Sequence, residues 1–156
     1  MIVIKNKILP FKGFSVLNIL GILFYRKGTY YNDEIPVTTL NHEAIHTRQQ
    51  YEIILVSALI ALVVANFSHS WWSVLLIVAL PLLLYVIGFI LEVVLPPYHS
   101  VARSKNPIKW LQKLWMDAYG DNCFEREAYS NEDNLEYLLN RKPFAWVSYI
   151  ITKRNG

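Results

Sequence analysis

The most prominent pattern in the chain is a run of 39 residues, from Ile53 to Leu91, that contains no Lys, Arg, Asp or Glu. A single helix of that length would reach ~58 Å at ~1.5 Å per residue, nearly twice the ~30 Å hydrocarbon core of a bilayer. Polar residues at 66–70 interrupt the run, so we expect two transmembrane crossings, at about residues 53–67 and 71–95. A buried helical hairpin in a soluble protein is the alternative, but a chain this short has little else with which to cover such a core.

Short apolar segments upstream of this run predict β-strands. Ile2 to Ile4 and Phe14 to Tyr25 are rich in aliphatic and aromatic residues, and lysines, proline and glycine punctuate them. The second segment is too short for a membrane helix, which needs ~20 residues, and it contains Asn18 and Gly21. We therefore expect a strand or hairpin at the membrane surface.

A helix is predicted to start near Leu40, with Thr38 or Thr39 as its N-cap. From there the chain reaches the first apolar segment without a proline or glycine. The sequence HEAIH, residues 42–46, and the first crossing are thus expected to form one continuous helix.

Composition narrows the class of protein. The chain has 156 residues, which suits a single domain, and 54% of them are hydrophobic while only 17% are charged. Such a chain can bury enough apolar surface to fold, so disorder is excluded, and its single cysteine, Cys123, excludes a disulfide framework. No nucleic-acid-binding module or glycine-rich phosphate loop is present.

The distribution of charge predicts the orientation. All 15 Lys and Arg lie outside the uncharged run, six before it and nine after it, and the connection at 66–70 has none. By the positive-inside rule both termini face the cytoplasm, and a bacterial inner membrane is the expected location.

HEAIH fits the H-E-x-x-H pattern of zinc peptidases. Residues at i and i+4 share a helix face, so His42 and His46 can bind one Zn²⁺, while Glu43 lies close enough to act as general base on a water molecule. A structural zinc site without turnover is the alternative, because the motif does not show an open coordination position.

A catalytic zinc site of this kind needs a third protein ligand. We favour Glu125, on a helix for which Asp121 is the predicted N-cap, and Glu127 lies about 200° away around the same helix. Glu127, Glu92 and His99 stay open as alternatives. A small residue on the Glu125 face, Ala128, would let the two helices approach closely.

These features resemble membrane-embedded metallopeptidases of the gluzincin type: heat-shock-induced bacterial membrane proteases, CAAX prenyl proteases and, more loosely, the metalloprotease domains of β-lactam sensor proteins. The resemblance rests on HEAIH in a helix, two apolar segments and then FEREAY. It implies that Glu125, the first Glu of E-R-E-A-Y, is the third ligand. Tyr129 stands where the family usually has the Asp that orients a zinc-binding His.

The sequence thus predicts a single mainly α-helical integral membrane domain, residues 1–156, with a small β element and an HExxH helix continuous with a transmembrane hairpin. We expect it to hydrolyse peptide bonds of loosely folded or juxtamembrane segments at the cytoplasmic surface. A non-catalytic membrane sensor or interaction protein with structural zinc is the alternative. The oligomeric state is left open, and the candidates for stabilising the oxyanion are His99, Tyr119, Arg126 and Tyr129.

Two further helices are predicted towards the C-terminus. Residues 106–119 have the spacing of an interfacial amphipathic helix, with ordinary core packing as the alternative. Another helix is expected to open at Ser130 to Asp133 and to run through Asn140, ahead of an aromatic tail at Phe144 to Ile151.

Overall fold

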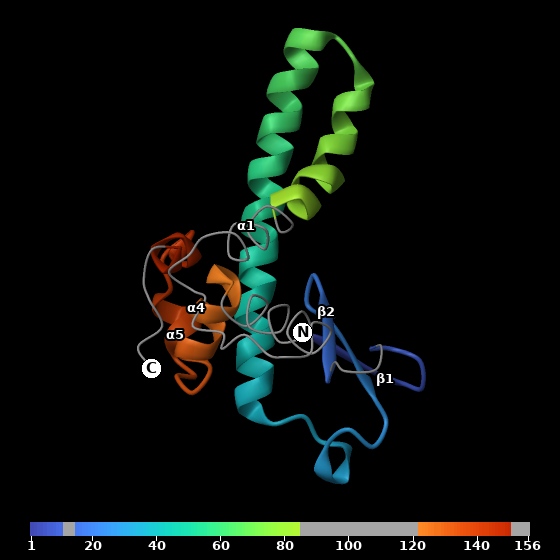
Figure 1. The fold of residues 1–156 in the computed structure, drawn as a ribbon, viewed down its shortest axis with the longest axis vertical. Coiled ribbons are helices and arrows are strands. Elements are labelled where there is room, and N and C mark those ends of the chain that lie inside the picture. Colours follow the sequence, from blue (N-terminus) through green and yellow to red (C-terminus); the bar gives the residue numbers. More distant parts are fainter. Residues whose placement is uncertain (11–14, 85–121, 151–156) are drawn as a thin grey trace, which may run out of the picture. The chain divides into compact units, whose positions relative to one another are not determined.

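The computed structural model describes residues 1–10, 15–84 and 122–150. Over these residues the chain is mainly helical and has one small sheet (Figure 1). Its strands are β1 (Ile2–Asn6), β2 (Val16–Ile19) and β3 (Ile22–Arg26), and its helices are α1 (Val37–Ser68), α4 (Cys123–Asn131) and α5 (Tyr137–Asn140). Short 3-10 helices occupy Tyr31–Asp33, Trp71–Leu75 and Ala145–Tyr149.

The sheet has three strands in the order β1-β3-β2, which confirms the predicted β element. β1 runs parallel to β3, with Ile2 opposite Ile22 and Asn6 opposite Arg26, and β2 is antiparallel to β3. Side chains alternate along β3, where Leu23 and Tyr25 are buried. The central strand therefore supplies the apolar interior of the sheet.

Helix α1 joins HEAIH to the apolar segment without a break, as predicted. It begins at Val37, three residues before the expected start, and the Pro36 carbonyl accepts a hydrogen bond from the Leu40 N–H at 3.0 Å. The N-cap prediction at Thr38 or Thr39 is thus wrong. Proline has a φ suited to a helix start, so the helix forms directly after Pro36 and both threonines lie in its first turn.

Among the described residues, α1 is the one helix long and apolar enough to cross a membrane. Only a narrow stripe of its apolar half is buried, formed by Ile53, Ser57 and Ala61, and the other faces expose large side chains, among them Leu55, Leu59, Leu62 and Val63. A core helix of a soluble protein would be mostly buried, whereas 17% of the most apolar window of α1 is buried, so α1 could cross a membrane.

A two-helix hairpin is not shown. After α1 ends at Ser68, the described chain contains a shorter apolar helix, Trp71–Leu84. Trp71 and Trp72 stack at its start with ring centroids 4.1 Å apart. The remainder of the predicted second crossing lies outside the described residues.

By its internal contacts the chain divides into two compact units, and the division falls within α1 and α4. The first comprises Met1–Glu52 with Glu127–Ala145, and so contains the sheet, the HEAIH half of α1 and the end of α4. The second comprises Ile53–Arg126 with Trp146–Gly156. In this second unit Ile53, Cys123 and Phe124 form a buried cluster with Trp146 and Tyr149 against it.

Helix α4 starts at Cys123 because Asn122 caps it. The Asn122 side-chain oxygen accepts the Phe124 N–H at 3.0 Å, and its carbonyl accepts the Arg126 N–H at 2.8 Å. Asn122 thus holds the position that was predicted for Asp121, which lies outside the described residues together with the predicted helix at 106–119.

The predicted helix from Ser130 through Asn140 is wrong. α4 ends at Asn131, and α5 covers only Tyr137–Asn140. The side-chain amide of Asn41 donates to the carbonyls of Asn131, Glu132 and Asn134 at 2.8–3.2 Å, so these carbonyls are satisfied in a turn instead of in a helix. The expected tail contains the 3-10 helix Ala145–Tyr149.

Candidate metal centre

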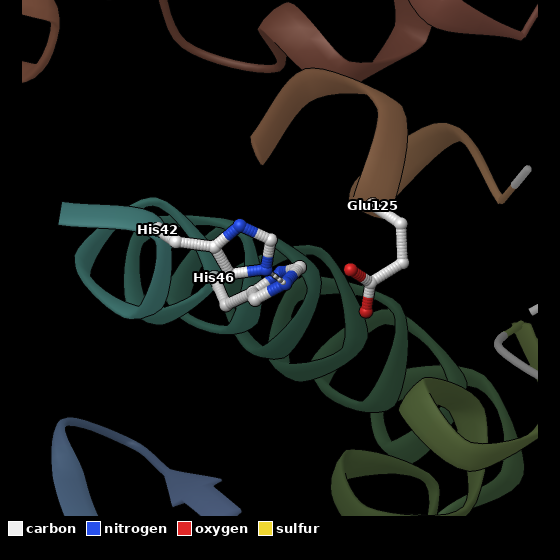
Figure 2. Close-up of side chains that lie close together, drawn as sticks. All are labelled: His42, His46 and Glu125. Carbon is white, nitrogen blue, oxygen red and sulfur yellow. Dashed lines mark hydrogen bonds between the residues drawn. The ribbon is translucent and has the colours of Figure 1, made fainter. Parts of the chain in front are cut away.

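The two histidines of HEAIH turn the same ring nitrogen toward each other (Figure 2). The Nε2 atoms of His42 and His46 are 3.0 Å apart, and the rings meet edge to face with centroids 4.7 Å apart. This follows from the helix itself, since residues four apart lie one above the other on a single face. Both histidines therefore present the atom with which imidazole commonly binds a metal.

The other nitrogen of His42 is held by a carboxylate. Its Nδ1 lies 2.8 Å from Oε2 of Glu132, in the turn that follows α4. An ionised carboxylate only accepts hydrogen bonds, so Nδ1 carries the ring hydrogen and Nε2 keeps a lone pair. Glu132 thus takes the orienting role for which Tyr129 offered no carboxylate, while the Tyr129 ring packs against the edge of the His42 ring at 4.7 Å.

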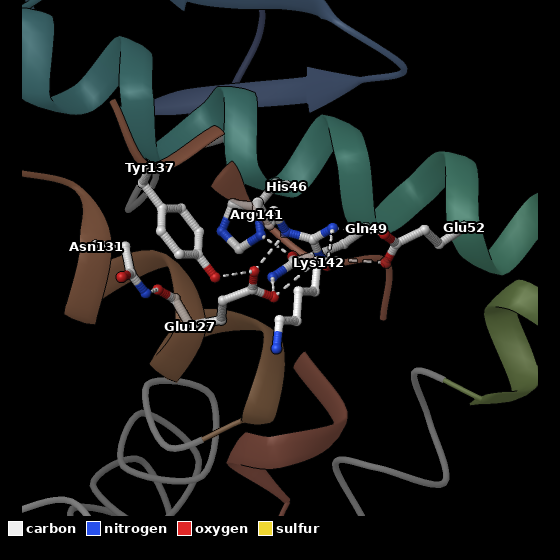
Figure 3. A network of polar contacts seen from close by, with 8 residues as sticks. All are labelled: His46, Gln49, Glu52, Glu127, Asn131, Tyr137, Arg141 and Lys142. Carbon is white, nitrogen blue, oxygen red and sulfur yellow. Dashed lines mark hydrogen bonds and ion pairs between the residues drawn. The ribbon is translucent and has the colours of Figure 1, made fainter. Parts of the chain in front are cut away.

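The other nitrogen of His46 is held through an amide (Figure 3). Nδ1 lies 2.7 Å from Oε1 of Gln49, and Nε2 of Gln49 donates to Oε2 of Glu127 at 2.9 Å. Because the carboxylate accepts, the amide NH₂ must face Glu127 and the amide oxygen must face His46. His46 is therefore also protonated at Nδ1, with its Nε2 lone pair directed at His42.

Arg141 holds Glu127 in place, and Glu127 in turn binds Gln49. Its guanidinium donates to both oxygens of Glu127, at 2.5 and 3.2 Å, and pairs with both oxygens of Glu52 (Figure 3). The Arg141 and Glu127 side chains are 4% and 0% exposed, and Tyr137 donates a further hydrogen bond to Glu127 at 2.8 Å. Burial by itself lowers the pKa of Arg141, but its hydrogen bonds to the two carboxylates outweigh burial and raise that pKa above its usual value.

The arrangement favours a cation between the histidines. In their neutral forms both Nε2 atoms carry lone pairs, which repel at 3.0 Å unless a proton or a metal ion lies between them. Two Zn–N bonds of about 2.0–2.1 Å at a tetrahedral angle would hold the nitrogens about 3.3 Å apart, close to the observed separation. The donor set therefore suits zinc with little rearrangement of the two rings.

Glu125 completes a group that could bind a metal ion. One ligand atom each from His42, His46 and Glu125 lie within 4.8 Å of one another, and Figure 2 shows the three side chains. His42 and Glu125 are buried and His46 is partly buried. Two imidazole nitrogens and one carboxylate oxygen are the protein ligands of a common type of catalytic zinc site.

The other predicted ligands are not part of this group. Glu127 belongs to the ion network with Arg141, whereas Glu92 and His99 lie outside the described residues. Of the oxyanion candidates, Tyr129 lies against His42, Arg126 is buried, and Tyr119 lies outside the described residues together with His99.

Glu43 is placed by contacts of its backbone. Its carbonyl accepts hydrogen bonds from the Asn18 side chain at 2.5 Å and from the Thr47 hydroxyl at 2.9 Å. Tyr30 lies near enough to be affected by its charge: burial and the Glu43 carboxylate both raise the pKa of Tyr30. Hydrogen bonds of the Tyr30 side chain with Ser15 and Thr39 oppose this rise in its pKa without reversing it, so the phenol stays protonated at neutral pH.

Sequence reasoning missed Glu132, Gln49, Arg141 and Asn18. Asn18 left a signal, as a polar residue inside an apolar strand. The signal for Gln49 was its place one helical turn after His46. Arg141 and Glu132 are about 90 residues away from their partners in α1, and no local spacing indicates such contacts.

No protein-family model matches the chain, and comparisons with curated proteins and with solved structures find no match.

Proposed function

We infer that the protein is a membrane-bound zinc metallopeptidase of the gluzincin type. The observation that carries this proposal is the pair of Nε2 atoms 3.0 Å apart, with the two Nδ1 atoms hydrogen-bonded to Glu132 and Gln49 and with Glu125 as a third possible ligand. Three protein ligands leave one position of a tetrahedral zinc ion for water or substrate, as catalysis requires.

Bound zinc supplies a Lewis acid and lowers the pKa of a water molecule towards ~7. Glu43 takes a proton from the attacking water and passes it to the leaving amine. Tyr129, whose ring packs against His42, would donate a hydrogen bond to the carbonyl oxygen as negative charge develops on it. Glu132 and Gln49 keep the two imidazoles in the tautomer that directs Nε2 at the metal.

The proposal places the site at the cytoplasmic face of a bacterial inner membrane. α1 would cross the bilayer, and the segment from Trp71 to about residue 95 would return, with both termini in the cytoplasm. A site at the foot of a membrane helix suits loosely folded or juxtamembrane peptide segments. The lipid bilayer and a peptide or membrane-protein substrate are then the partners.

A sensor protein with structural zinc would need a closed set of four ligands. Among the described residues, the group that could hold a metal has three members.

The experiment that tests the proposal is zinc-dependent cleavage by the purified full chain in detergent or proteoliposomes. We expect a chelator to abolish hydrolysis of an unfolded reporter protein, because the metal supplies the Lewis acid. Added Zn²⁺ should restore hydrolysis, and the reporter fragments would be detected by mass spectrometry. Cleavage that persists after the metal content has fallen to zero would contradict the proposal.

Glu125→Gln should weaken zinc binding strongly, because it removes both a charge and a ligand. Competition with a chromophoric chelator would measure the affinity. Glu136→Gln is the matched control, since Glu136 is an exposed carboxylate and the substitution changes the same atoms. Equal affinities of the two variants would exclude Glu125 as a ligand.

A further inference from the structure

One end of the sheet is fixed to α1 just ahead of the uncharged run. The N–H of Leu20 donates to Oε1 of Gln50 at 2.7 Å, and the hydroxyl of Tyr51 donates to the Leu20 carbonyl at 3.1 Å. Gly21, with φ of +85°, approaches so closely that a Cβ there would lie 3.3 Å from Thr47 Cγ2. The β2–β3 turn thus lies at the level where α1 is about to enter its apolar half (Figure 1).

This end of the sheet exposes four large apolar side chains: Met1, Ile2, Ile19 and Leu20, which we call the sheet tip. Their exposed fractions are 57%, 63%, 49% and 40%. A hydrogen bond of 2.9 Å from the Ile2 N–H to the Gly21 carbonyl holds the start of β1 beside the turn. Apolar side chains clustered at one exposed end typically mark a surface that contacts a partner or a membrane.

The opposite end of the sheet is basic. Lys5 lies opposite Tyr25 and Arg26 opposite Asn6, and Lys7 and Lys27 follow these strands. Four residues at ~3.3 Å each place this end ~13 Å from the sheet tip. Asp33 pairs with Lys5 at 2.6 Å, so the positive charge that can attract anionic lipid headgroups comes from Lys7, Arg26 and Lys27.

We propose that the sheet tip inserts into the membrane leaflet that α1 enters, as a second attachment of the unit that holds HEAIH. Elements of this kind bury apolar side chains ~5–10 Å into the boundary between headgroups and acyl chains. That depth leaves Arg26 and Lys27 near the phosphates. The inference rests on the proposed membrane crossing of α1. Insertion of the sheet tip would fix the distance between HEAIH and the bilayer surface.

Fluorescence quenching by lipids labelled on their acyl chains tests the inference. The full chain with Cys123→Ala would carry one new cysteine, Ile19→Cys or, as a second variant, Leu20→Cys, linked to an environment-sensitive dye. Thr29→Cys is the matched control, because Thr29 is exposed in the turn beyond the basic end of β3. The protein would be reconstituted in vesicles of phosphatidylcholine and phosphatidylglycerol.

We expect the labels at Ile19 and Leu20 to lose most of their fluorescence to the lipid quencher and the label at Thr29 to keep it. Equal quenching at the three positions would overturn the inference. Labels at the sheet tip that neither the lipid quencher nor a water-soluble quencher reaches would also overturn the inference. Another protein surface would then cover the tip. Extraction of the chain from the vesicles by alkaline carbonate is the separate outcome that would refute the crossing of α1.

Discussion

Glu43→Gln should abolish peptide hydrolysis while leaving zinc in place. The substitution keeps the size and helix propensity of the side chain, and Glu43 is placed through its backbone carbonyl, which the substitution does not change. The loss should be roughly 10²–10⁴-fold, the usual contribution of a positioned general base. Cleavage of an unfolded reporter protein and zinc content, measured on one preparation, would give both results.

Glu34→Gln is the control for this experiment, because Glu34 is an exposed carboxylate outside the site. If Glu43→Gln releases zinc, Glu43 is a ligand or supports one, and the proposed mechanism fails. If zinc stays bound and both variants cleave as fast as the wild type, Glu43 is not the base and the structural-zinc interpretation becomes the better one.

Arg141→Met should produce the largest loss of stability. It would leave the buried carboxylate of Glu127 and the partly buried carboxylate of Glu52 with no guanidinium between them. Breaking a buried ion pair on one side costs about 3–5 kcal/mol in the free energy of unfolding. Denaturant titration of the detergent-solubilised protein, followed by circular dichroism, would measure that free energy.

Lys142→Met is the control, since the neighbouring side chain is exposed and its removal should change the free energy of unfolding by less than ~0.5 kcal/mol. Removing the carboxylates as well, with Glu52→Gln and Glu127→Gln, should recover part of the loss, because no uncompensated charge then stays buried. A loss for Arg141→Met no greater than for Lys142→Met would show that the ion network contributes little.

Helix periodicity made the pairing of His42 and His46 predictable from the sequence. Spacing alone places His42 and His46 on one face of a helix, and the absence of proline and glycine after them predicts that the helix continues into the apolar segment. The short strands were predictable for a similar reason, because residues that favour strands alternate with residues that favour turns.

Element boundaries and long-range contacts were less accessible. Capping preferences pointed to Thr38 or Thr39, but the fixed φ of Pro36 starts α1 earlier. The end of α4 depends on the Asn41 amide, which binds carbonyls about 90 residues away. Local propensity contains no information about such a contact.

The carboxylate that orients His42 could not be identified from the sequence either. A spacing rule derived from the resemblance looks for a carboxylate at position 129, where the chain has Tyr129. The structure instead brings Glu132 to His42 from the turn after α4. The turn brings a carboxylate to His42 from a position that the family spacing does not indicate. Zinc chemistry therefore predicts that a carboxylate orients this histidine, but it does not predict which residue supplies the carboxylate.

Anomalous diffraction at the zinc absorption edge, from crystals of the purified full chain, tests the central claim most directly. The account predicts one zinc peak in contact with Nε2 of His42, Nε2 of His46 and a carboxylate oxygen of Glu125. The fourth position should be open to solvent, and the Glu43 carboxylate should lie near it without touching the metal. Crystals grown with zinc that show no peak between the histidines, or a peak enclosed by four protein ligands, would contradict the account.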